Sequence, residues 1–127
     1  MTLITRAALI GGLLLAAAPA HATLTVVPGL TVHNKCPWDL AIAVRYKDSR
    51  GNWATSGFTT VLGRQRKERV ISSNNSVFYY YAENSRGGRW SGSRNVQVEG
   101  KTYLMKETRL SFNRNSNSFT LGLVCTR

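Results

Sequence analysis

The chain has 127 residues, with 17 lysines and arginines against six acids, and a formal net charge of +11 at pH 7. This length is enough for one compact domain with a modest core and too short for two ordinary domains. The positive excess predicts attraction to polyanions and acidic surfaces, but it carries no information about the fold.

Residues 1–22 have the pattern of a cleavable secretory signal, in which Arg6 precedes an apolar run and Ala20-His21-Ala22 ends it. The apolar run of about a dozen residues is too short to span a bilayer with ease. We therefore expect cleavage after Ala22 and a mature domain of residues 23–127, periplasmic or secreted, with a formal charge of +10. An uncleaved N-terminal anchor is the alternative.

The two cysteines, Cys36 and Cys125, lie near the two ends of the mature domain. An exported chain passes through an oxidising compartment, so we expect them to form a disulfide. Closing a loop of about 90 residues would remove on the order of 4–5 kcal/mol of unfolded-chain entropy, as an upper figure. A redox or metal centre is disfavoured by the spacing and by the lack of partner ligands, so we expect no metal and no cofactor.

Residues 30–34 form the first expected strand, which leads into Cys36. In residues 39–58, alternate apolar residues from Leu40 to Tyr46 would face a core, residues 47–52 contain turn formers, and residues 53–61 resume an extended pattern, which predicts a hairpin. Further strands are expected at residues 66–71, 77–82, 89–92, 96–98, 101–112 and 119–125, with turns between them.

Residues 104–109 could instead form a short helix, because their helix propensity is fair. The run of residues 77–82 has large side chains on both faces, so it is either covered on both sides or presents one face as a binding surface. With about eight short strands and frequent turns, the expected fold is all-β, a single antiparallel β-sandwich. The disulfide would tie its first strand to its last.

No catalytic constellation is visible in the sequence. His33 is the only histidine left after cleavage, and no motif places a nucleophile or an orienting carboxylate beside it. The six acids are scattered, so nothing selects a pair for a glycosidase or a cluster for calcium. A hydrolase is therefore the least favoured hypothesis, and we identify no catalytic residue.

Two basic groups are the best candidates for binding an anion or a partner. The first contains Arg64, Arg66, Lys67 and Arg69, and the second contains Arg86, Arg89 and Arg94. Twelve of the 17 cations are arginines, whose planar fork donates two parallel hydrogen bonds to phosphate or carboxylate. The alternative is a solvated face whose charge protects an edge strand from pairing with other chains.

Aromatic residues accompany these groups. Tyr79, Tyr81 and Trp90 could form an aromatic binding surface, as in proteins that stack sugars or bases beside basic grooves. Core packing is the competing interpretation for these residues and for the other large aromatics, Trp53, Phe58, Tyr80 and Tyr103. We expect Trp38 to pack against the disulfide.

Several stretches resemble a known family: 34–36 (Asn-Lys-Cys), 41–48 (Ala-Ile-Ala-Val-Arg-Tyr-Lys-Asp), 51–58 (Gly-Asn-Trp-Ala-Thr-Ser-Gly-Phe), 79–83 (Tyr-Tyr-Tyr-Ala-Glu) and 90–92 (Trp-Ser-Gly). In this order they resemble a small exported bacterial domain of unknown function, the family numbered ten-thirty-six. Thr59 and the segment 63–65 depart from that family's pattern of a second aromatic and a Gly-Glu-Cys segment. The resemblance implies an exported β-domain and supplies no activity.

Charge, export and the lack of catalytic motifs favour a non-enzymatic binding module. Its partner would be an anionic envelope component or an acidic macromolecule, and nucleic acid is possible without a motif to support it. The alternative is a periplasmic inhibitor or immunity protein that blocks one enzyme or toxin through charge steering and a few aromatic anchors.

Overall fold

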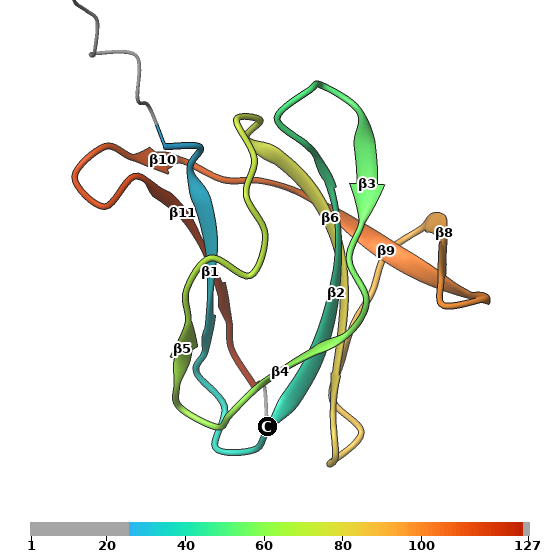
Figure 1. Cartoon of the computed structure of the whole chain (residues 1–127). Coiled ribbons are helices and arrows are strands. Elements are labelled where there is room, and N and C mark those ends of the chain that lie inside the picture. Colours follow the sequence, from blue (N-terminus) through green and yellow to red (C-terminus); the bar gives the residue numbers. More distant parts are fainter. Residues whose placement is uncertain (1–25, 126–127) are drawn as a thin grey trace, which may run out of the picture.

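The structure is a computed structural model that describes residues 26–125. It is all-β, with two sheets that face each other (Figure 1). The eleven strands are β1 (Gly29–Asn34), β2 (Leu40–Lys47), β3 (Trp53–Thr55), β4 (Thr59–Val61), β5 (Arg66–Lys67), β6 (Val77–Asn84), β7 (Arg89–Trp90), β8 (Arg94–Val98), β9 (Lys101–Arg109), β10 (Phe112–Asn113) and β11 (Ser118–Leu123). The expected signal segment, residues 1–22, lies outside the described residues. Within the described part, no helix is long and apolar enough to cross a membrane.

The smaller sheet has the strand order β10-β11-β1-β5. Its central pair, β1 and β11, is parallel, so the expectation of a purely antiparallel fold is wrong at this place. In the sequence, all strands of the larger sheet lie between β1 and β11. A connection of this length allows β11 to run parallel to β1. Because both strands run the same way, the cysteines that follow them meet, with Cα atoms 5.2 Å apart. The predicted Cys36–Cys125 disulfide is confirmed, and it does tie the first strand to the last.

The larger sheet has the order β3-β2-β6-β9-β8, with β4 also paired to β2 and β7 to β6. The predicted hairpin is confirmed, because β2 and β3 pair antiparallel. The second arm of the hairpin is broken into β3 and β4 at Ser56. There the hydroxyl of Ser56 accepts a hydrogen bond from the Val44 amide at 3.0 Å, and the Ser56 amide donates to the Val44 carbonyl at 2.8 Å.

Two further expectations differ from the structure. Residues 104–109 belong to strand β9, which pairs with both β6 and β8, so tertiary pairing overrides their helix propensity. The strand expected at residues 66–71 is only two residues long. Its continuation is interrupted at Arg69, whose φ of 52° is left-handed and incompatible with a regular strand.

The main core fills the space between the two sheets (Figure 1). From the larger sheet it receives the alternate residues of β2 that the sequence predicted, Leu40, Ile42 and Val44, all buried. Phe78 of β6 meets Phe119 of β11 edge to face, with ring centroids 5.3 Å apart. These contacts bury one face of each sheet.

A second, smaller cluster lies on the opposite face of the larger sheet, where Ala43, Tyr81 and Met105 are buried together with Val96 and Val98. The larger sheet curls so far that Phe58, just before β4, packs against Tyr103 of β9 at 5.1 Å. The sheet is therefore a nearly closed barrel. For this reason Tyr81 is buried in the small cluster on one face of β6, while Tyr80 is buried in the main core on the other face.

Candidate functional site

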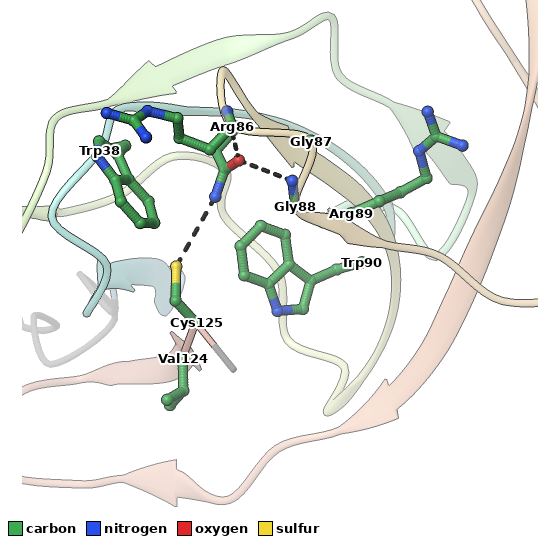
Figure 2. A pocket seen from close by; sticks show the side chains of 9 residues that line it. Trp38, Arg86, Gly87, Gly88, Arg89, Trp90, Val124 and Cys125 are labelled. Carbon is green, nitrogen blue, oxygen red and sulfur yellow. Dashed lines mark hydrogen bonds between the residues drawn. The ribbon is translucent and has the colours of Figure 1, made fainter. Parts of the chain in front are cut away.

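A pocket of about 670 Å³ opens where β6 turns into β7, next to the disulfide (Figure 2). Three parts of the chain build it: the β1–β2 connection, the β6–β7 turn and the residues that follow β11. Its lining residues are Trp38, Asn84, Arg86, Gly87, Gly88, Arg89, Trp90, Val124 and Cys125. We call it the tryptophan pocket.

The β6–β7 turn is held by Asn84. Its Oδ1 accepts hydrogen bonds from the backbone amides of Arg86 at 2.9 Å and Gly88 at 2.8 Å. Gly87 has a φ of 83°, which favours glycine, and a Cβ on Gly88 would lie 2.6 Å from the Asn84 amide nitrogen. The turn is therefore fixed by its own sequence, Asn-Ser-Arg-Gly-Gly, and it presents Arg86 in a defined position.

The disulfide and a second asparagine fix the other side of the pocket. Asn84 Nδ2 donates a weak hydrogen bond to Cys125 Sγ at 3.7 Å, which joins the turn to the disulfide. Asn34 is fully buried, donates to the Trp38 carbonyl at 2.8 Å and accepts from the Cys36 amide at 3.0 Å. Trp38 is thus anchored through its backbone beside the disulfide, as Figure 2 shows.

Two cations and two indole rings give the pocket its chemical character. The Arg86 guanidinium carbon lies 5.0 Å from the centre of the Trp38 ring, a cation–π contact. Trp90 packs against the main core and also lines the pocket, whereas Arg89 extends away from Trp38 (Figure 2). Among residues 26–125, no carboxylate lines the pocket. The pocket can therefore hold an anionic group beside an apolar ring surface.

The second basic group from the sequence is divided by the fold. Arg86, Arg89 and Trp90 come together at the tryptophan pocket. Arg94 belongs to β8 and lies over Tyr79, 4.9 Å from the ring centre. The predicted basic group is thus divided between the two ends of β6, with Arg94 near Val77 and with Arg86 and Arg89 near Asn84.

Tyr81, proposed from the sequence as part of an aromatic surface, is only 7% exposed and belongs to the small hydrophobic cluster. Its hydroxyl donates to Glu83 Oε1 at 2.8 Å. Burial is the main cause that raises the pKa of the Tyr81 phenol, and the hydrogen bond to Glu83 adds to it. Of the three residues of that surface, Tyr79 and Trp90 remain partly exposed.

The first basic group is dispersed around the smaller sheet. Lys67 Nζ donates to Thr59 Oγ1 at 3.0 Å, and Arg69 donates to the Val27 carbonyl. Arg66 and Lys67 line a shallower hollow of about 520 Å³, in which Asp39 supplies a carboxylate. Arg64 is exposed in the preceding loop. Since Asp39 brings a negative charge into this hollow, whereas no carboxylate of residues 26–125 lines the tryptophan pocket, this group is the weaker candidate.

Other titratable groups serve local structure. Half-buried His33 lies opposite Arg66 in the β1–β5 pair. Desolvation lowers the pKa of His33, and the nearby charges of Arg66 and Lys35 lower it further. Asp48 Oδ1 accepts hydrogen bonds from two backbone amides of the β2–β3 turn. Among the described residues there is no group of three or more His, Cys, Asp or Glu side chains placed to hold a metal ion.

Sequence reasoning did not assign Asn84, Val124 or Trp38 to a site. Two signals were available. The Asn-Ser-Arg-Gly-Gly turn implies an asparagine that caps its own loop, and a disulfide at Cys125 brings Val124 and the residues after Cys36 together. Neither signal reveals that the turn and the disulfide lie side by side, because that contact joins residues 41 positions apart.

No family model, curated protein or solved structure matches this chain. The resemblance to the exported domain family numbered ten-thirty-six therefore stays a prediction, and the site has to be interpreted from its own geometry.

Proposed function

We propose that this protein is a non-enzymatic exported binding module, periplasmic or secreted, that recognises an anionic component of the cell envelope in the tryptophan pocket. One observation carries the proposal: the Arg86 guanidinium lies over the Trp38 ring within a 670 Å³ pocket that Trp90 also lines and to which no carboxylate of residues 26–125 contributes.

The pocket suits a ligand with a negative group on a sugar-like body. A guanidinium stacked on an aromatic ring keeps its in-plane N–H groups available for phosphate or carboxylate. Trp90 supplies an apolar surface for the body of the ligand. Arg89 also lines the pocket, but it lies opposite Glu83 in the β6–β7 pair and its side chain extends away from Trp38, so Arg86 is the main positive group. The pocket, of about 670 Å³, is open to solvent, so it would contact one side of a small ligand.

Export is supported by the signal-like residues 1–22 and by the disulfide, which persists in oxidising compartments.

The test uses the oxidised mature chain, residues 23–127, titrated with N-acetylglucosamine 1-phosphate and with glucose 6-phosphate while tryptophan fluorescence is recorded. Uncharged N-acetylglucosamine is the ligand control. We expect saturable binding of at least one anionic sugar and a loss of about tenfold or more in affinity when Arg86 and Arg89 are both changed to Gln, because charge-assisted hydrogen bonds are lost.

The matched control is Arg64→Gln with Arg114→Gln, which removes the same charge outside the pocket. Equal losses in the two double variants would overturn the proposal. Affinity capture from an envelope extract, eluted along a salt gradient, separates the alternatives: anionic saccharides should elute at modest salt. A single protein retained at high salt in fixed stoichiometry would replace the proposal with the inhibitor hypothesis.

A further inference from the structure

A second basic and aromatic region lies at the other end of β6, outside the tryptophan pocket. We call it the basic face and define it by Arg45, Lys47, Trp53, Tyr79, Arg94, Glu107 and Arg109. We infer that the basic face binds an extended anionic polysaccharide along its surface. This inference goes beyond the proposed function, because it concerns a different site and a polymeric ligand.

Strand register places these residues together. Across the larger sheet, Trp53 lies opposite Lys47, Arg45 opposite Tyr79 and Tyr79 opposite Glu107. Arg109 pairs with Val77, two residues before Tyr79. Side chains at alternate positions share one face, so all of these residues leave the sheet on the side away from the main core. Arg94 lies on β8 opposite Met105, and the curl of the sheet brings it over Tyr79 of β6.

The cations of the basic face are held on aromatic rings. The guanidinium carbon of Arg94 lies 4.9 Å from the Tyr79 ring centre. Arg45 and Lys47 lie 5.5 Å and 5.7 Å from the centre of the Trp53 ring. Trp53 and Tyr79 themselves meet edge to face at 5.6 Å. The positive groups are therefore positioned before any ligand arrives, which lowers the entropy cost of binding.

This arrangement favours a polysaccharide over single-stranded nucleic acid. Proteins that bind single strands use aromatic ring faces to stack bases. On the basic face, the protein's own cations already occupy faces of Trp53 and Tyr79. Arg94 donates one hydrogen bond to the Tyr79 hydroxyl at 3.5 Å, and Arg45 donates one to Thr55 Oγ1 at 3.3 Å. Their other N–H groups are suited to carboxylate or sulfate, so charge without base stacking is the chemistry on offer.

The balance of charge supports the same ligand. The basic face contains four cations and one carboxylate, Glu107. Asp48, in the adjacent β2–β3 turn, directs one carboxylate oxygen to the backbone amides of Arg50 and Asn52. A polymer with regularly spaced negative groups matches several separate cations better than a compact anion does.

The experiment measures binding of the oxidised mature chain to immobilised polygalacturonate, with neutral dextran and oligo-deoxythymidine as comparison polymers. The test variant is Arg45→Gln with Arg94→Gln, and the matched control is Arg64→Gln with Arg114→Gln. We expect the test variant to lose about tenfold in affinity and the control less than about threefold, because short-range ionic hydrogen bonds outweigh screened distant charges.

A second variant, Arg45→Lys with Arg94→Lys, keeps the charge but removes the stacked forks, and it should bind at an intermediate level. The thermal midpoint of each variant checks that the fold is intact. The pocket variant Arg86→Gln with Arg89→Gln should retain polygalacturonate binding, so failure of the basic face and failure of the proposed pocket are distinguishable. Equal losses in test and control variants, no binding of polygalacturonate, or tighter binding of oligo-deoxythymidine would overturn the inference.

Discussion

The two ends of strand β6 both combine arginine with aromatic rings, but they are built differently. At the Val77 end, the rings of Trp53 and Tyr79 are covered by cations from neighbouring strands of the same sheet. At the Asn84 end, a turn, the disulfide and Trp38 come from distant parts of the chain. The first region follows from the register and curl of one sheet, whereas the second is hollow and depends on contacts between distant segments.

Composition alone therefore does not define a binding region. Arg94 and Arg86 look alike in the sequence, each near an aromatic residue and a glycine. In the fold, Arg94 lies over Tyr79 on the face of the larger sheet away from the main core, and Arg86 borders the tryptophan pocket. Substitutions that perturb one region and leave the other intact should separate the two.

The largest effect is expected when the disulfide is removed by Cys36→Ser with Cys125→Ser. The unfolded chain gains entropy, so the free energy of unfolding should fall by up to about 4–5 kcal/mol. The tryptophan pocket should lose its sugar-phosphate affinity, because Asn84 and Trp38 are both tied to the disulfide region. Urea denaturation and fluorescence titration measure these changes. The basic face should still bind polygalacturonate at a temperature where the variant is folded, and parallel losses at both regions would contradict the comparison.

Asn84→Ala should have the next largest effect. It removes the acceptor of two backbone amides and the donor to Cys125, at a cost of about 1–2 kcal/mol in the free energy of unfolding. Asn84→Asp restores the acceptor oxygen, so it should recover most of the stability while still weakening anion binding through its negative charge. Chemical denaturation and ligand titration of both variants test this. If Asn84→Asp binds anionic sugars as well as the original protein, the turn does not border the site.

Replacing one tryptophan in each region by phenylalanine should give a smaller effect. Trp90→Phe should weaken sugar-phosphate binding by about 1 kcal/mol, the scale of an aromatic contact, and leave polygalacturonate binding unchanged. Trp53→Phe should do the reverse, because Arg45 and Lys47 lose part of their cation–π partner. Isothermal titration of both variants against both ligands gives four affinities. The comparison fails if the two substitutions have the same pattern.

The smallest effect concerns His33, which belongs to neither region. Its pKa is lowered in the folded protein, so below its unfolded pKa of about 6.5 the unfolded state binds the proton more readily. The contribution of neutral His33 to the free energy of unfolding is therefore fully present above that pH and decreases as the pH falls below it. Urea unfolding between pH 5.5 and 7.5 should show a small decline that His33→Gln reduces. Ligand affinities at both ends of β6 should be the same in this variant.

Much of the local structure could be predicted from the sequence. Alternation from Leu40 to Tyr46 identified the core face of β2, and Asp48 to Asn52 identified its turn, because both patterns depend on neighbouring residues. The parallel pairing of β1 with β11 could not be predicted, since a strand pattern does not encode the direction of its partner. Tyr81 was equally ambiguous, because its burial depends on β8 and β9 curling over the outer face of β6.

By itself, the sequence determined the all-β class, the disulfide partners and the positive charge. It could do so because alternation is local, there are two cysteines, and charge is a sum over residues. Only the tertiary structure decided that Arg86, Arg89 and Trp90 border a pocket while Arg94 lies on a separate face. That division depends on how the larger sheet curls and where the disulfide places Trp38 and Val124, both of which follow from packing between distant segments.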